Sequence, residues 1–102
     1  MFGKMGDMMG KLKEMKQKAD GIKLKLDATL INVEGAGGDI KIVITGNRDI
    51  KSLVITDALQ HGNKEELEKQ LVVTLNKALL KANETNEQEM KQVANGMLPG
   101  LG

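Results

Sequence analysis

The first part of the chain carries apolar residues at a helical spacing. From Met5 to Leu26 the steps alternate between three and four residues, at Met5, Met8, Leu12, Met15, Ala19, Ile22 and Leu26. This alternation is the heptad pattern of a helix with one apolar seam. Gly10 and Gly21 each weaken such a helix by about 1 kcal/mol relative to Ala. The pattern predicts a long helix over residues 4–26.

Three β-rich runs follow, at Thr29–Glu34, Ile40–Thr45 and Ile50–Thr56. They are rich in β-branched residues, and Ile occupies every second position of the middle run. The connections, GAGGD and GNRD, are short and contain residues that favour turns. Because short connections join antiparallel strands, we expect a three-stranded antiparallel meander over residues 28–56.

A second long helix is expected after a short irregular stretch. Asn63 followed by Glu66 matches a capping box, which marks a helix start. Good helix formers continue to residue 94, where Asn95-Gly96 provides a stop. The sequence therefore predicts a helix over residues 63–94 and a flexible tail over residues 95–102.

The two halves of this second helix differ in polarity. The first half is thickly apolar, whereas residues 83–89 (NETNEQE) are all polar. A helix of roughly 30 residues is about 45 Å long, which exceeds the width of a compact domain of this size. We expect the first half to form core or interface and the second half to project. The candidate dimer-interface residues are Leu67, Leu71, Val72, Leu75 and Leu79.

These elements predict a single α+β domain over residues 1–102, ordered α-β-β-β-α, with a long helix at each end of the sheet segment. Phe2 is the only aromatic residue, so the core must be built from aliphatic side chains. A thin core on a short chain favours extra burial through oligomerisation. The fold is therefore expected to be dimeric.

Charge is unevenly distributed, although the net charge is only +1. Residues 1–26 carry a balance of +4, residues 27–62 carry −2, and the remainder carries −1. Six lysines flank the apolar seam at heptad positions e and g: Lys4, Lys11, Lys16, Lys18, Lys23 and Lys25. In a coiled coil of two copies these positions would face one another, so the first helix is not expected to pair with its own copy along its length.

Two interpretations of the lysine row remain open from the residues alone. Lysines that flank an apolar stripe commonly keep it soluble and extend along it. A row of lysines also binds nucleic acid, because each ammonium that meets a phosphate releases counterions without reading the sequence. No aromatic residues are interleaved with the lysines, so base stacking on single strands is not expected.

Catalytic and metal-binding chemistry finds no support in the sequence. The chain has no Cys, and its single histidine, His61, has no partner for a metal site or a catalytic triad. The GAGGD run precedes a strand, whereas a phosphate loop requires a helix to follow. We expect no enzyme activity, no cofactor and no small-molecule substrate. The absence of a signal peptide and of a long apolar run predicts a cytoplasmic protein without membrane contact.

Several segments resemble the YbaB/EbfC family of nucleoid-associated proteins. They are the opening Met1-Phe2-Gly3-Lys4, the Lys- and Met-rich heptad helix, Gly35 to Ile42 (GAGGDIKI), Thr45-Gly46-Asn47, Lys64 to Glu68 leading to Asn76-Lys77-Ala78, and Gly96 to Leu101. Together they cover nearly the whole chain in order. The resemblance implies a non-enzymatic homodimer with two projecting helical arms that hold duplex DNA, and a role in chromosome organisation and gene regulation in the nucleoid.

On this basis we expect phosphate contacts from Lys4, Lys11, Lys16, Lys18 and Arg48. Two alternatives remain. The Met-rich helix and the apolar tail could form a protein–protein adaptor, since methionine makes adaptable contacts. RNA binding by the lysines is a third possibility.

Overall fold

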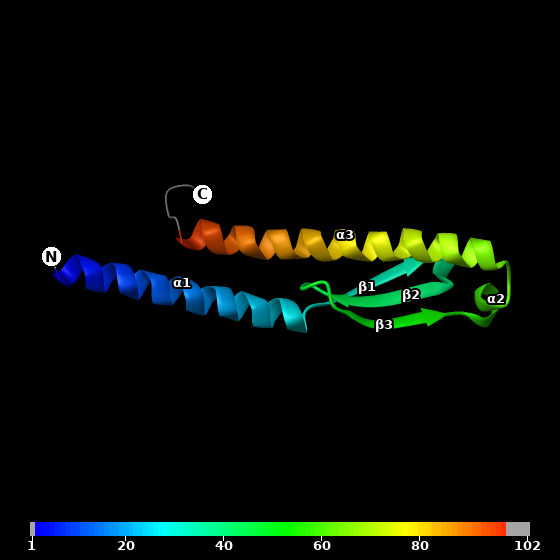
Figure 1. Ribbon diagram of the computed structural model, residues 1–102, viewed down its shortest axis with the longest axis horizontal. Helices are drawn as coiled ribbons and strands as arrows, with labels where there is room; N and C mark the ends of the chain where they lie inside the picture. Colours follow the sequence, from blue (N-terminus) through cyan, green and yellow to red (C-terminus); the bar gives the residue numbers. More distant parts are fainter. Residues whose placement is uncertain (1, 98–102) are drawn as a thin grey trace.

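The computed structural model describes the backbone of residues 2–97 and the side chains of residues 9–95. In chain order the elements are α1 (Phe2–Ala28), β1 (Leu30–Gly35), η1 (Ala36–Gly38), β2 (Ile40–Thr45), β3 (Ile50–Ile55), α2 (Asp57–Gln60) and α3 (Lys64–Met97). The strands form one antiparallel sheet in the order β1-β2-β3. Helix α3 runs along the sheet, and α1 extends beyond the end of the sheet (Figure 1). The predicted α+β class and meander are confirmed.

The central strand β2 provides most of the sheet's contribution to the core. Its alternate residues Ile40, Ile42 and Ile44 are buried. Because successive side chains of a strand point to opposite faces, these three residues lie on one face of the sheet. Val33 of the neighbouring strand joins them in the same cluster. The Ile repeat seen in the sequence therefore marks the face that packs on helix α3.

Helix α3 meets this face with small residues. Thr74, Ala78 and Ala82 recur every four residues, and all three are fully buried. Residues four apart lie on the same side of a helix. The small side chains allow the helix to approach the sheet closely. Leu71 and Leu75 pack at the edge of the same cluster and are partly buried.

Strand β3 is left largely uncovered. Helix α3 contacts β1 and β2 extensively, but contacts β3 little. All residues of β3 from Ile50 to Val54 are exposed, and Ile55 is half-buried. Leu53 pairs with the buried Ile42, so the two side chains lie on the same face of the sheet. This face is therefore completed over two strands and open over the third.

The two hairpin connections differ in form. The glycine-rich connection forms η1, where Ala36, Gly37 and Gly38 adopt positive φ angles of 53°, 67° and 97°. Such angles are accessible to glycine at little cost. Strand β2 follows after Asp39, so the chain does not continue from this turn into a helix. The second connection is the turn Gly46–Asp49, in which Arg48 has a φ of 70°.

Some boundaries differ from the sequence prediction. A single helical turn, α2, forms within the stretch expected to be irregular. Four residues are too few to show a helical period, so the pattern could not reveal it. Helix α3 continues through Asn95-Gly96 to Met97, because glycine weakens a helix without necessarily ending it. Residues 98–102 of the predicted tail lie outside the described part of the chain.

The start of α3 agrees with the predicted cap. The Glu66 backbone N–H donates a hydrogen bond to Asn63 Oδ1 at 3.2 Å. This bond satisfies one of the amide groups that have no partner within the helix. The Glu66 carboxylate accepts a hydrogen bond from Gln70 at 2.9 Å. Polar side chains thus fix the start of α3 beside α2.

The molecule is much longer than a compact domain of the same size. Its extents are 71 × 23 × 17 Å and its radius of gyration is 20.0 Å. A compact chain of this length has a radius of gyration of about 13 Å. The excess comes from α1 and the second half of α3, which continue past the sheet (Figure 1).

Candidate nucleic-acid interface

Most of α1 projects from the body of the protein. We refer to residues 2–21 as the α1 arm. Every described side chain of the arm, from Met9 onward, is exposed. Among the described side chains of α1, residues 9–28, only Ile22 and Leu26 are buried. From Leu12 onward the seam is buried against the body only at its last two positions, and Leu12 and Met15 remain 63% and 50% exposed.

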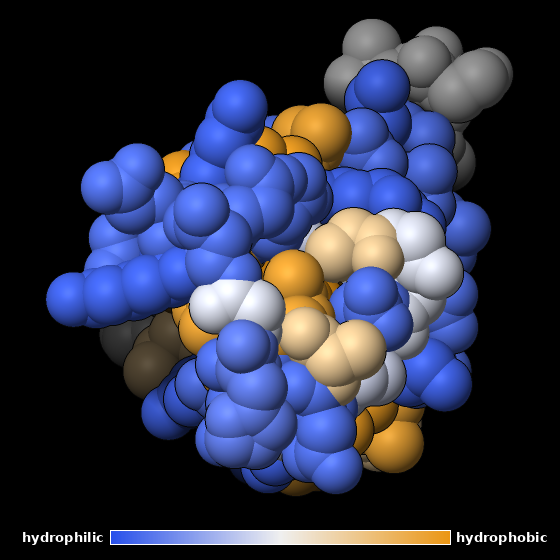
Figure 2. Space-filling model, turned by 90° about the vertical axis from the view of Figure 1, so that its right-hand side faces the viewer, coloured by the Kyte–Doolittle hydropathy of each residue, from blue (hydrophilic) through white to orange (hydrophobic). Residues whose placement is uncertain are grey.

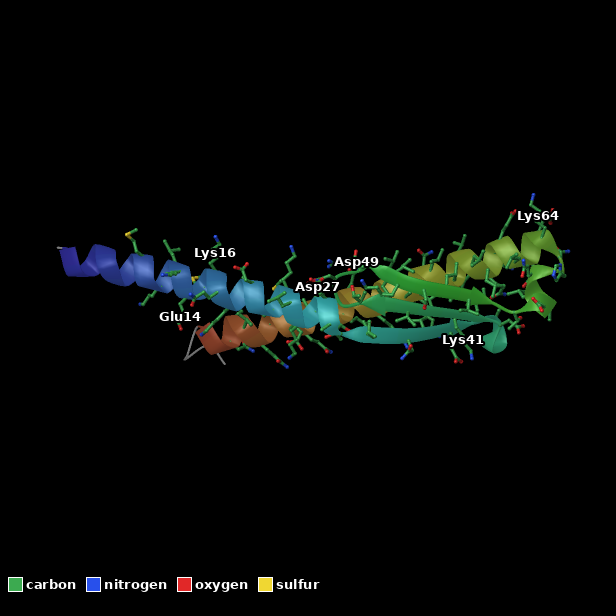
Figure 3. The ribbon with its side chains drawn as sticks, turned by 90° about the horizontal axis from the view of Figure 1, so that it is seen from below. Glu14, Lys16, Asp27, Lys41, Asp49 and Lys64 are labelled. Atoms are coloured by element: carbon green, nitrogen blue, oxygen red, sulfur yellow. The ribbon has the colours of Figure 1, made fainter. Side chains whose placement is uncertain are left out.

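The arm carries lysines along both flanks of its seam. Lys11 and Lys18 lie on one flank and Lys16 lies on the other, all exposed to solvent. Lys11 and Lys18 are seven residues apart, which corresponds to about 10 Å along a helix. Lys16 and Glu14 project to opposite sides of the arm (Figure 3). The arm therefore presents ammonium groups in a row along one rod.

Acidic neighbours engage only part of this row. Lys18 forms an exposed ion pair with Glu14 at 3.4 Å. An exposed pair of this type contributes about 0–1 kcal/mol, so a phosphate can displace the carboxylate. Among the side chains of residues 9–95, no ion pair involves Lys11 or Lys16. Most of the described charge on the arm is available to a ligand.

Two further candidates lie in different places. The side chain of Lys4 falls outside the described residues, although its backbone lies in α1. Arg48 is exposed, but it lies in the β2–β3 turn, where its Nε donates a hydrogen bond to Asn83 Oδ1 of α3. Arg48 is thus not on the arm with the lysines.

The five residues predicted at a dimer interface differ in how exposed they are. Leu71 and Leu75 are partly buried against the core of their own chain. Leu67 is half-buried near the start of α3. Val72 and Leu79 are 59% and 40% exposed. Only the last two are therefore largely free to contact another molecule.

Val72 and Leu79 belong to the side of α3 that faces β3. Asn83 follows Leu79 by one helical turn, and it contacts the β2–β3 turn through Arg48. The opposite side of α3 faces the free edge of β1, because the Lys77 ammonium donates a hydrogen bond to the Glu34 carbonyl at 3.1 Å. The residues on this opposite side include Val73 and Leu80, 56% and 58% exposed.

An apolar surface therefore lies between α3 and β3. We call it the α3/β3 surface and define it by five side chains: Ile50, Leu53, Val72, Leu75 and Leu79. Monomeric proteins rarely leave large contiguous apolar areas in water. Hydrophobic side chains are also visible among polar ones at the end of the molecule where α3 begins (Figure 2).

Sequence reasoning missed a group of polar residues around the Gly46–Asp49 turn. Asn47 contacts α1, whereas Asn83 and Asn86 of α3 contact the turn. The GNRD run predicted a turn, but nothing in the residue pattern identifies the two helices that the turn contacts. These residues join the arm to the rest of the chain.

The comparison with protein families decides the assignment. The model of the YbaB/EbfC DNA-binding family matches residues 1–97. The chain belongs to the YbaB/EbfC family. This is a DNA-binding family and not an enzyme family. The predicted resemblance is confirmed.

The chain is also similar to proteins that are named nucleoid-associated and to a solved structure. A nucleoid-associated protein of Flavobacterium johnsoniae is 48% identical over 94 residues, covering 92% of this chain and 88% of the relative. A nucleoid-associated protein of Gloeobacter violaceus is 33% identical over 106 residues, covering 99% and 96%. An uncharacterised protein from Helicobacter pylori has a similar solved structure, with a TM-score of 0.71, 25% identity and coverage of 93% and 94%.

Other kinds of site find little support in the described structure. Among the described residues, no group of three His, Cys, Asp or Glu side chains is arranged to hold a metal ion. No helix between residues 2 and 97 contains an apolar stretch long enough to cross a membrane. The lysine row on the arm remains the strongest candidate site in this YbaB/EbfC protein.

Proposed function

We propose that the chain forms a homodimer that binds duplex DNA through phosphate contacts made by the α1 arms. The observation that carries the proposal is the row of exposed lysines on a helix that projects from the body. Lys11, Lys16 and Lys18 are the described residues assigned to phosphates. Lys4 and Arg48 are additional candidates. Membership of a DNA-binding family supports the same partner.

The contacts are proposed to read the DNA backbone and not the bases. Lysine acts as a flexible point charge and contacts phosphate without sequence information. Binding of this kind suits a protein that coats or bridges chromosomal DNA at many sites. We therefore propose a role in chromosome organisation and gene regulation, within the nucleoid of the cytoplasm, in keeping with the nucleoid-associated names of the relatives.

A second copy of the chain is proposed to cover the α3/β3 surface. The face of the sheet is closed over β1 and β2 by α3, but is open over β3, where Leu53 is exposed. Val72 and Leu79 lie on the adjacent side of α3. A second copy would bring the same set of side chains, which is the self-complementary arrangement of a two-fold interface. Dimerisation would also place two arms on one particle.

The near-neutral net charge is compatible with this proposal because the charges are segregated. The first 26 residues hold the positive balance of +4, and the rest of the chain is slightly acidic. Electrostatic attraction between exposed charges decays within about 10 Å at moderate salt. DNA lying along the arms would therefore meet mainly positive charge.

A salt titration of DNA binding tests the proposal directly. The fraction of a short duplex bound is measured by fluorescence anisotropy across a series of salt concentrations. The logarithm of the affinity should fall linearly with the logarithm of salt, with a slope of about 0.9 for each phosphate contact. Binding that is absent at low salt, or that is insensitive to salt, would refute it. A structured RNA of similar charge shows whether RNA is preferred.

The adaptor function is the second candidate, favoured by the exposure of Leu12 and Met15. Both side chains lie on the seam of the arm with nothing from the described part of this chain covering them. The double substitution Lys11→Glu and Lys18→Glu separates the two functions. It should abolish DNA binding, whereas a partner held by the apolar seam would still bind.

A further inference from the structure

The direction of the α1 arm is determined by very few contacts. Among its described side chains, α1 buries only Ile22 (7% exposed) and Leu26 (0% exposed). Two neighbouring apolar contacts at one end of a rod restrain its direction weakly. Several hydrogen bonds near this end of α1 converge on the Gly46–Asp49 turn.

The turn binds the last turns of α1. The Gly46 backbone N–H donates to the carbonyl oxygens of Leu26 and Thr29, each at 3.1 Å. The Asn47 side-chain amide donates to the Lys23 carbonyl at 3.0 Å and to the Asp27 carboxylate. One asparagine thus contacts two successive turns of the same helix.

The turn is also bound to α3. The Asn86 side-chain amide donates to the Gly46 carbonyl at 3.2 Å. Arg48 Nε donates to Asn83 Oδ1. A direct ion pair joins the two helices beside the turn, with Lys25 Nζ 3.0 Å from the carboxylate of Glu89. The turn therefore lies between α1 and α3 and contacts both (Figure 3, near the labels Asp27 and Asp49).

The turn itself is held in place by the side chain of Thr45, at the end of β2. The Thr45 hydroxyl is buried and accepts the backbone N–H groups of Asn47 at 3.2 Å and Asp49 at 3.1 Å. Gly46 also permits close contact with α1, because a Cβ at this position would lie 2.6 Å from a methyl carbon of Leu26. A rigid turn on the sheet thus provides a fixed reference for the arm.

We propose that the Gly46–Asp49 turn is the joint that sets the direction of the α1 arm, and that Asn47 is its positioning residue. Asn47 is not among the residues proposed to contact phosphate, and its positioning role goes beyond the proposed function. The arm extends about 30 Å from Ile22 to its tip, given 1.5 Å per residue. A tilt of about 10° at the joint would therefore move the tip by about 5 Å. Such a shift is of the same order as the spacing between neighbouring phosphates along a DNA strand.

Distance measurements between two spin labels test the joint without DNA. The chain has no native Cys, so Gln17→Cys on the arm and Asn76→Cys on α3 give specific labelling. Both positions are exposed, and neither side chain takes part in the hydrogen bonds described for residues 9–95. Labelled protein is mixed with a large excess of unlabelled protein, so that only distances within one chain are recorded.

Asn47→Ala should broaden or shift the distance distribution between the two labels. Asn32→Ala is the matched control, because Asn32 is exposed on β1 and its side chain forms no hydrogen bond within residues 9–95. The control should retain the parent distribution, and both variants should retain the parent melting temperature within a few degrees. An unchanged distribution in folded Asn47→Ala would overturn the proposal.

A second variant covers the case in which Asn47→Ala does not fold. Asn86→Ala removes the Asn86 hydrogen bond between α3 and the turn, while the Arg48–Asn83 bond and the bonds to α1 stay in place. It should likewise broaden the distribution, and an unchanged distribution would overturn the proposal. DNA affinity at fixed salt is a separate readout, and it should fall several-fold in Asn47→Ala but not in the control Asn32→Ala. A parent protein that fails to bind DNA would refute the proposed function, while the distance result would still decide the joint.

Discussion

Gly35 and Thr74 are in direct contact where β1 meets α3. A Cβ atom on Gly35 would overlap the Thr74 hydroxyl oxygen and lie 2.8 Å from the Thr74 Cβ. Thr74 cannot easily move away, because it is fully buried and its hydroxyl donates to the Gln70 carbonyl at 2.7 Å. The end of β1 therefore requires a residue without a side chain for reasons of packing, since Gly35 has an ordinary extended φ of −142°.

Gly35→Ala should destabilise the protein by about 1–3 kcal/mol, which is the usual cost of overpacking a core. Urea unfolding followed by circular dichroism measures the change. Thr74→Ala removes the hydroxyl that stands closest, so the double variant should lose less stability than the sum of the two single variants. If the losses of unfolding free energy in the two single variants add up to the loss in the double variant, the two positions are not energetically coupled.

Leu79→Glu should prevent the proposed dimer from forming, because it places a charge in the apolar centre of the proposed interface. Loss of a central interface side chain commonly costs about 2 kcal/mol or more of association energy. Light scattering coupled to size-exclusion chromatography measures the mass. Leu80→Glu is the matched control, since Leu80 is the more exposed residue but lies on the β1 side of α3. A dimer that survives Leu79→Glu and is lost with Leu80→Glu would place the interface on the β1 side.

Lys16→Gln should weaken DNA binding and lower the slope of its salt dependence by about 0.9 for each phosphate that the arm no longer neutralises. Lys41→Gln removes the same charge from the sheet, away from the arm (Figure 3), and should leave the slope nearly unchanged. Both lysines are exposed, so neither substitution should alter the fold. Equal effects of the two variants would indicate attraction by overall charge and not contact by the arm.

Gly10→Ala should make the arm more helical without affecting the core. Nothing lies within 4 Å of a Cβ at this position. Alanine is favoured over glycine in a helix interior by about 1 kcal/mol. Amide hydrogen exchange should slow in the arm while the exchange of β2 is unaltered. Faster exchange in the arm would show that Gly10 has a role beyond flexibility.

The regular elements were predictable because the apolar residues in them repeat at a constant spacing without interruption. The Ile repeat of β2 and the heptad seam of α1 each specify one face, and the structure buries Ile40, Ile42 and Ile44 as that repeat requires. The heptad seam of α1 did not predict which of its residues pack against the body. A heptad pattern indicates which face of a helix is apolar, but not what covers that face. Leu12 and Met15 are thus exposed, whereas Leu26 on the same seam is buried.

The candidate site was only partly predictable, for a similar reason. The sequence placed the lysines on the flanks of the seam, and their exposure follows from that position. The role of Leu71 and Leu75 in the core of their own chain depends on how far α3 extends across the sheet, which no local pattern records. The contacts of the Asn47 side chain with α1 join residues 20 and 24 positions apart and involve no repeat. Long-range polar contacts of this kind become visible only in three dimensions.

The openness of the sheet over β3 has a consequence for how the protein behaves on dilution. If a second copy covers the α3/β3 surface, part of the stability of each chain is supplied by mass action, and the melting temperature rises with total protein concentration. A newly made chain at low concentration would then be less resistant to proteolysis than a chain in the dimer. Cellular levels of the protein would in this way govern its lifetime as well as its occupancy of DNA.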